Sequence, residues 1–259
     1  MIEIRDKQIV IDGAPRLIIS GEIHYFRLRR KEWEDRILKL KAAGGNTVAS
    51  YIPWLCHELE NGDIDLDGHS RPELDLGAFI DLCAAHGMYF FARPGPFIMA
   101  EMKNEGIPYR LYEDHPELIP VGWDGAPAPV RTLDYLAPAF LEVARGWYSH
   151  VIPVIASRLI RKGGNGGNVI ALQLDNEIGM LSWVTNTPDL TDFVIADFRK
   201  WLVAQGGQAA TYGGAADDPA AFARFVRSPG QDGAGDLMRD LGHYMRYRFT
   251  RYVAELRCY

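Results

Sequence analysis

Two polar side chains that could act on a substrate follow an apolar stretch in the second half of the chain. Val169–Leu172 is a short apolar run after a Gly-rich approach, the pattern of a buried parallel strand. Asn176 and Glu177 stand where this strand should end. Parallel α/β barrels carry their chemistry at the carboxyl ends of their strands, so Glu177 is a candidate catalytic carboxylate. Taken alone, the stretch also fits an ordinary loop carboxylate.

Polar and aromatic side chains also follow three earlier apolar runs, each of which predicts a strand. They are Glu22 and His24 after the first run, Tyr51, Trp54, His57 and Glu58 after the second, and Arg93 and Glu101 after the third. Any one of them alone is better explained as a packing residue. Together, rings and carboxylates suit a sugar, because the C–H faces of a sugar stack on rings while its hydroxyl groups need acceptors. The set predicts a carbohydrate site on one face of a barrel.

The segments that position these groups alternate short apolar runs with helical patterns. Strands are predicted at residues 17–22, 46–51 and 88–93 and from Val169 onward. Helices are predicted around residues 33–40 and at about 75–87. A long helix is predicted from the apolar face of residues 136–147, and Pro153 should kink or break it further along. Repeated strand and helix units predict a parallel sheet. Ahead of them, residues 2–10 and 10–19 predict a hairpin about the turn at 12–15.

The chain after Glu177 predicts helices and no further strand. Helices are expected at residues 190–202, 222–226 and 236–256, with a Gly/Ala/Asp-rich loop at 208–218. We therefore predict an α/β fold, a (β/α)8 TIM barrel of which this chain holds only the first four strands and their helices. Its single domain divides into a hairpin (1–16), the strand and helix units (17–180), an inserted helical and loop segment (181–235) and a long helix (236–259).

Composition excludes several classes of protein. The 259 residues are 47% hydrophobic and carry a net charge of −6, without the basic stripe that a nucleic-acid partner requires. There is no long apolar run and no signal-peptide pattern at the start, so we expect a cytoplasmic protein with no membrane association. Three scattered cysteines and the lack of metal-ligand spacing predict neither disulfides, nor a metal site, nor a cofactor.

Five segments together resemble glycoside hydrolase family 35, the β-galactosidase family. In order they are ISGEIHYFR, WEDRILKLKAAGGNTV, YIPWLCHE, DLGAFIDLCAAHGMYFFARPGPFI and VIALQLDNEIG. The resemblance covers residues 9–179, and its segments are weak singly but specific as a set. Residues 190–259 more loosely resemble the inserted helical segment of the related family 42. The resemblance implies a TIM barrel and a sugar substrate.

The resemblance also implies roles for individual residues. Glu177 would be the general acid/base and Asn176 would bind the sugar 2-hydroxyl, while Tyr51, Glu101 and the backbone around Ala100 would line the galactose subsite. A general acid must be protonated at neutral pH, which burial and a neighbouring carboxylate favour. In a retaining enzyme that neighbour is the nucleophile, which the family takes from a seventh strand that this chain does not contain.

Some positions depart from the family pattern. Leu55 stands where Asn is usual, Met102 where Trp is usual, and Ile178 where Tyr is common. Galactose specificity is therefore a weaker expectation than the reaction class. We expect a retaining β-galactosidase-type hydrolase acting on an oligosaccharide or galactoside. The alternatives are an inactive carbohydrate-binding barrel and a metal-dependent barrel hydrolase, which the missing ligand spacing disfavours. Open sheet edges would also favour association, as in a homo-oligomer.

Overall fold

The chain forms two compact units. The computed structural model describes residues 2–123, 125–128, 132–161, 166–179, 188–205, 212, 217–228 and 231–259. Unit 1 comprises Met1–Pro108 and Gly146–Asn176, and unit 2 comprises Tyr109–Arg145 and Glu177–Tyr259. Asn176 and Glu177 are neighbours in sequence and stand on either side of the boundary.

A three-stranded antiparallel sheet opens unit 1. Strand β1 (Ile2–Arg5) pairs with β2 (Gln8–Ile11), which pairs with β3 (Ala14–Pro15). The predicted hairpin had one turn, at residues 12–15. A second turn at Asp6 and Lys7 splits its first strand, and both residues have left-handed φ values of 52° and 63°. Turns with two left-handed residues match the twist of the flanking strands.

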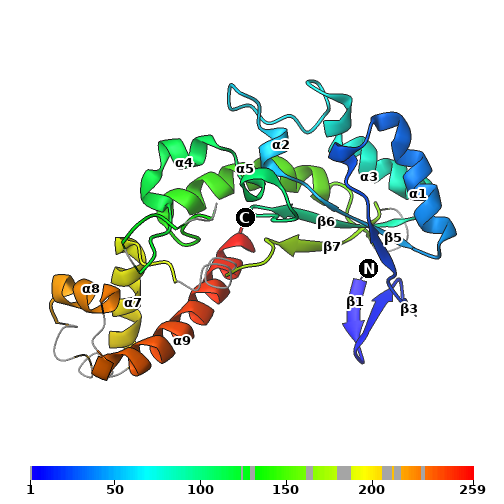
Figure 1. Cartoon of the computed structure of the whole chain (residues 1–259). Coiled ribbons are helices and arrows are strands. Elements are labelled where there is room, and N and C mark those ends of the chain that lie inside the picture. The colour runs from blue at the N-terminus through cyan, green and yellow to red at the C-terminus, as the bar shows by residue number, and fades with distance from the viewer. Residues whose placement is uncertain are drawn as a thin grey trace. The chain divides into compact units, whose positions relative to one another are not determined.

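The main sheet of unit 1 has four parallel strands, as predicted. They are β4 (Ser20–Glu22), β5 (Thr47–Tyr51), β6 (Tyr89–Gly95) and β7 (Val169–Leu174), and they pair in this order (Figure 1). Strand β6 continues past the predicted end at Arg93, because Gly95 pairs with Leu174 beyond a register shift. Among the described residues these strands form an open sheet and not a closed barrel.

Two helices pack on this sheet through aromatic side chains. Helix α1 (Trp33–Ala42) and helix α3 (Leu76–Ala85) lie side by side (Figure 1). Phe79 of α3 meets Trp33 and Phe90 with ring centroids 5.2 and 6.0 Å apart, and all three side chains are almost fully buried. The Asp75 side chain caps α3 by accepting a hydrogen bond from the Ala78 backbone N–H at 2.9 Å. Both helices match the predicted periodicity.

Strand β7 departs from the prediction that both of its faces are covered. Only Val169 is buried, and Leu172 is 38% exposed. The reason is its outer place in the sheet order, because among the described strands only β6 pairs along its length. The Gly-rich connection predicted before it lies partly outside the described residues, at positions 162–165.

Helix α5 (Pro138–Ala156) contributes residues to both units. Pro153 was predicted to kink or break this helix, yet the helix continues to Ala156. A proline near the last turn removes only one backbone donor, and the Pro153 carbonyl still accepts from the Ser157 N–H at 3.1 Å. Its position close to the helix end explains why it does not interrupt the helix.

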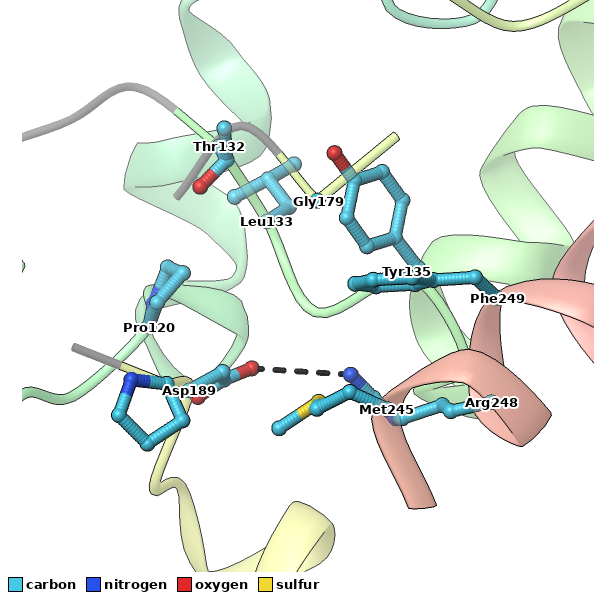
Figure 2. A pocket seen from close by; sticks show the side chains of 10 residues that line it. Pro120, Thr132, Leu133, Tyr135, Gly179, Asp189, Met245, Arg248 and Phe249 are labelled. Carbon is cyan, nitrogen blue, oxygen red and sulfur yellow. Dashed lines mark ion pairs between the residues drawn. The ribbon is translucent and has the colours of Figure 1, made fainter. Parts of the chain in front are cut away.

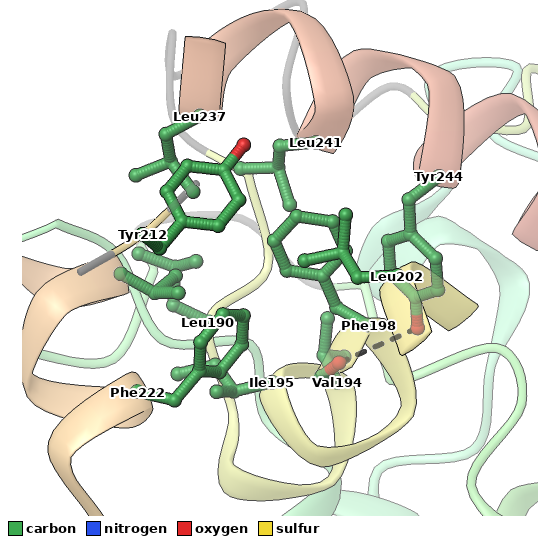
Figure 3. Close-up of a cluster of buried hydrophobic side chains, with 11 residues drawn as sticks. Leu190, Val194, Ile195, Phe198, Leu202, Tyr212, Phe222, Leu237, Leu241 and Tyr244 are labelled. Carbon is green, nitrogen blue, oxygen red and sulfur yellow. Dashed lines mark hydrogen bonds between the residues drawn. The ribbon is translucent and has the colours of Figure 1, made fainter. Parts of the chain in front are cut away.

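Unit 2 is helical among its described residues. It contains α4 (Arg110–Asp114), α7 (Asp192–Ala204), α8 (Pro219–Arg227) and α9 (Gln231–Leu256). Figure 3 shows the core shared by α7, α8 and α9, where Phe198, Phe222 and Tyr244 meet with each side chain fully buried. Most of the predicted 208–218 loop lies outside the described residues. No helix in the described part of the chain is long and apolar enough to span a membrane.

Candidate active site

Arg93 connects the carboxyl ends of all four strands of the parallel sheet. Its Nε donates to Gln173 Oε1 at 3.0 Å, one terminal nitrogen donates to Glu22 Oε1, and the other donates to Asn176 Oδ1 at 3.3 Å. The guanidinium carbon lies 3.7 Å from the centroid of the Tyr51 ring. The Arg93 side chain is only 13% exposed. One side chain therefore ties the ends of β4, β5, β6 and β7 together.

The Asn176 amide is held in one orientation. Its Oδ1 accepts from Arg93 and from Gln173 Nε2, the latter at 2.8 Å, and its Nδ2 donates to the Ile98 carbonyl at 3.1 Å. These partners assign the oxygen and nitrogen positions, because only donors face one and only an acceptor faces the other. The Asn176 backbone N–H also donates to Asp175 Oδ1 at 2.7 Å. Since Nδ2 carries two hydrogens and Ile98 accepts one, the described residues leave the other for a ligand.

Tyr51 contacts both Arg93 and His24. It is 5% exposed, and the His24 ring centroid lies 5.4 Å from its own. Burial lowers the pKa of His24, an effect that nearby Glu22 opposes and that Arg27 and Arg93 reinforce. His24 is therefore neutral near pH 7, and its ring lies against the Tyr51 ring. The predicted grouping of Glu22, His24 and Tyr51 is present in unit 1.

Ala100 and Glu101 lie on a loop after β6 with unusual backbone. Met99, Ala100 and Glu101 all have left-handed φ values, of 52°, 52° and 50°. For residues with a Cβ this costs roughly 1–2 kcal/mol each. Arg27 offsets part of that cost by donating to the Ala100 carbonyl at 3.1 Å. Glu101 is exposed and makes no hydrogen bond or ion pair with the described residues.

Glu177 directly follows Asn176 and has a left-handed φ of 52°. Its side chain is exposed. The described residues therefore do not provide the burial that the family resemblance implies for an acid/base residue. Asp175 is almost fully buried and has its own backbone partner in the Asn176 N–H.

His57, Trp54 and Glu58 were predicted on the same face, and the structure corrects their roles. His57 is fully buried, with Nδ1 donating to the Asp65 carbonyl and Nε2 accepting from the Tyr25 hydroxyl, both at 2.6 Å. Burial lowers the pKa of His57 to about 4, so it is a neutral core residue. Trp54 of α2 (Trp54–His57) stacks on Trp147 and donates to Glu58. Helix α2 thus carries Trp54 and His57 in the core, while Glu58 follows its end and is half-buried.

Arg93, Gln173 and Arg27 carry more of the site than the sequence reasoning gave them. Arg93 was expected at a strand end without a role, and neither Gln173 nor Arg27 was proposed as a site residue. The available signal was register, because β5 and β6 place Tyr51 directly opposite Arg93. A charged residue in a parallel strand that is otherwise apolar requires partners on its neighbours. Strand β7 pairs with β6, and its polar residue Gln173 is such a partner.

Unit 2 has a separate small cavity (Figure 2). It measures about 20 Å³, and its lining includes Thr132, Tyr135, Asp189, Arg248 and Phe249. That volume holds roughly one water molecule and no sugar ring. We place the candidate site at the strand ends of unit 1 because Tyr51 and Asn176 meet there around Arg93. Among the described residues there is no group of three His, Cys, Asp or Glu side chains that could hold a metal ion.

Curated relatives share this sequence over most of its length. An exo-β-D-glucosaminidase from Thermococcus kodakarensis is 38% identical over 211 residues, which cover 78% of this chain and 26% of the relative. A β-1,2-glucosyltransferase from Ignavibacterium album is 34% identical, covering 76% of this chain and 27% of the relative. Human β-galactosidase-1-like protein 3 is 39% identical, covering 65% and 23%. The chain thus spans about a quarter of the length of these relatives.

Solved structures show the same fold at low identity. The cold-adapted β-galactosidase from Rahnella sp. R3 gives a TM-score of 0.63 at 18% identity, over 92% of this chain and 33% of that one. The β-galactosidase from psychrophilic Marinomonas ef1 gives 0.55 at 18%, over 76% and 26%. The model of glycosyl hydrolases family 35 matches residues 8–206. This chain therefore belongs to glycosyl hydrolases family 35.

Proposed function

We propose that the protein is a retaining glycoside hydrolase that removes a terminal β-linked galactose, or a related sugar, with Glu177 as general acid/base. One observation carries the proposal. Asn176, immediately before Glu177, is fixed by three side-chain hydrogen bonds at the edge where four parallel strands end. Family membership gives this edge its chemistry, because barrel enzymes act at the carboxyl ends of their strands.

The other proposed contacts with the sugar come from residues near the same edge of the sheet. Asn176 donates its remaining amide hydrogen to the sugar 2-hydroxyl, while Tyr51, Ala100 and Glu101 line the subsite. Glu101 has no ion-pair partner among the described residues, so its carboxylate is available to accept hydrogen bonds from sugar hydroxyls. Glu177 protonates the leaving oxygen and later activates water, as a retaining mechanism requires. No step requires a cofactor.

A retaining mechanism needs a second carboxylate about 5–5.5 Å from the acid/base. The resemblance places it on the seventh strand of a barrel, whereas the described main sheet has four strands. We propose that the nucleophile is supplied by a part of the barrel outside residues 1–259.

The test replaces Glu177 by Gln in the protein at its natural length. We expect hydrolysis of nitrophenyl β-galactoside to fall about 10²–10⁴-fold, the range for a lost general acid/base, while galactose binding by calorimetry is retained. Glu60, exposed elsewhere in unit 1, is the matched control, and Glu60→Gln should leave both readouts unchanged. Wild-type protein that binds galactose without hydrolysing any β-glycoside would instead support the carbohydrate-binding alternative.

The anomeric form of the first product tests the retaining assignment separately. Proton NMR of the reaction should show the β-anomer before mutarotation. Initial release of the α-anomer would contradict the retaining mechanism and leave the glycosidase proposal in place.

A further inference from the structure

Building on the proposed function, we infer that Arg93 is a positioning residue that makes Asn176 a hydrogen-bond donor only, so that the site selects a neutral hydroxyl over an ammonium group at the sugar 2-position. The inference rests on how the donors and acceptors around Asn176 are already used. It addresses a question that the relatives leave open, since they are named as enzymes of galactose, glucosamine and glucose units.

The oxygen of the Asn176 amide is saturated. A carbonyl oxygen has two lone pairs, and Oδ1 receives one N–H from Arg93 at 3.3 Å and one from Gln173 at 2.8 Å. A ligand N–H or O–H therefore finds no acceptor on this side chain. The nitrogen donates one hydrogen to Ile98 and keeps the other. Asn176 can consequently offer a ligand a hydrogen and nothing else.

Arginine has the geometry that this arrangement needs. Its planar fork carries five N–H donors in fixed directions, and here they reach Glu22, Gln173 and Asn176 at once. The plane also lies over the Tyr51 ring. A lysine ammonium would retain the charge beside Glu22 but could not hold Gln173 and Asn176 in the same geometry. Donation from a cation also polarises the amide and strengthens its remaining N–H as a donor.

The sugar group that meets Asn176 must therefore accept a hydrogen bond. A hydroxyl oxygen has lone pairs and accepts, whereas an ammonium group has three donors and none. An ammonium here would also face the Arg93 guanidinium across Asn176. Selection is expected to be strong, because a site built to hydrogen-bond a substrate group discriminates against analogues that cannot pair with it.

The experiment compares kcat/KM for three nitrophenyl β-glycosides that differ only at carbon 2: the 2-hydroxy, 2-deoxy and 2-amino galactosides. Wild-type protein at its natural length should prefer the 2-hydroxy substrate by about tenfold or more over each analogue, consistent with loss of one well-placed hydrogen bond. In Arg93→Met the ratio between the 2-hydroxy and 2-deoxy substrates should fall towards one, and in Arg93→Lys it should be intermediate.

Arg158→Met is the matched control. Arg158 also lies in unit 1 and forms a two-pronged pair with Asp81 at 2.7 and 2.8 Å, away from the strand ends. Its loss should leave the substrate ratio unchanged, whatever its effect on stability. If Arg93→Met does not fold, Gln173→Leu removes the other donor to Asn176 Oδ1 and should lower the ratio in the same direction.

Each outcome separates the inference from the proposed function. If Arg93→Met lowers all three rates equally and keeps the ratio, Arg93 is only a structural tie and the glycosidase proposal stands. If wild-type protein prefers the 2-amino substrate, the donor-only assignment of Asn176 is wrong. If folded wild-type protein hydrolyses none of the three, the proposed function fails and the role of Asn176 fails with it.

Discussion

Arg248 and Arg93 are both removed from water, and their surroundings differ in charge. Arg93 has one carboxylate partner, Glu22, and its other contacts are neutral. Arg248 in unit 2 is 1% exposed and faces two buried carboxylates, Asp134 and Asp189. Figure 2 shows its pairing with Asp189. One buried cation cannot balance two anions, so one carboxylate of this trio should hold a proton more readily than usual.

Asp189 is the carboxylate that should take the proton. Asp134 receives the Arg248 ion pair, two backbone N–H groups and the Thr191 hydroxyl. Asp189 lies 4.0 Å from the nearest Arg248 nitrogen and, among the described residues, accepts from the backbone N–H groups of Val121 and Thr191 and from the Thr191 side chain. Burial raises the pKa of Asp189 to about 6.

Replacing Asp189 by Asn should remove a pH dependence of stability. Between about pH 4 and pH 6 the folded protein holds a proton on Asp189 that the unfolded chain has released. Wild-type unfolding free energy therefore falls as pH rises through this window, by roughly 3 kcal/mol for a pKa raised by about two units. Asn cannot titrate, so Asp189→Asn should lack that loss. Urea unfolding at pH 4, 5, 6 and 7 measures the difference between the two proteins.

The control for this pH series is Asp114→Asn, at a carboxylate in the same unit that is 57% exposed. It should differ from wild type by the same small amount at every pH. A constant difference between wild type and Asp189→Asn across the series would contradict the shared-proton argument.

At the scale of elements, α7 is fixed to α8 and α9 by one buried face. Phe198 of α7 is fully buried between Phe222 and Tyr244, with centroids 5.8 and 5.0 Å away (Figure 3). Phe193 on the same helix is 38% exposed. The difference follows from helical periodicity, because five residues is not a whole number of turns and the two rings point to different faces.

Phe198→Ala should destabilise unit 2 far more than Phe193→Ala. Removing a fully buried ring leaves a cavity and costs about 3–5 kcal/mol, whereas truncating the exposed ring should cost less than about 1 kcal/mol. Thermal unfolding followed by circular dichroism compares the two variants. Equal losses would show that this core does not hold α7 in place.

The order and type of most elements could be predicted from periodicity alone. Trp33, Phe79 and Phe198 each belong to a separate run of apolar residues at helical spacing, and each lies on the buried face of its helix. Local conformation was harder to predict. Asp6 adopts left-handed φ without a glycine as a signal, and Pro153 is tolerated because the helix is about to end. The backbone conformation at Asp6 and the tolerance of Pro153 both depend on the surrounding structure, which a pattern of apolar residues does not describe.

Some residues of the candidate site could be predicted from the sequence, but the hydrogen bonds that connect them could not. Strand ends indicated Tyr51 and Asn176, which Arg93 connects in the structure. His57 was wrongly assigned to the site face, because a neutral buried histidine and an active-site histidine look alike in sequence. Side-chain hydrogen bonds across strands depend on register, and register was not available until the strands were paired.

At the scale of the whole molecule, β7 is an outer strand of the unit 1 sheet, although its apolar sequence is typical of an interior strand. Parallel strands are normally covered on both faces, yet in β7 only one residue is buried and Leu172 is 38% exposed. Relatives about four times longer share this segment, which makes up 26% and 27% of two of them. We expect that in proteins of that length a further strand pairs with β7 and the sheet closes into a barrel.

Residues 1–259 produced alone should therefore self-associate through the edge of β7. An exposed apolar edge strand presents unpaired backbone groups that another copy can pair with. Leu172→Lys places a charge on that edge and should shift the segment towards monomer, because like charges would meet when two such edges pair. Val203→Lys, on the exposed surface of α7, adds the same charge away from the sheet and should leave association unchanged. Light scattering over a concentration series measures both, and a monomeric wild-type segment at every concentration would show that the edge is already protected.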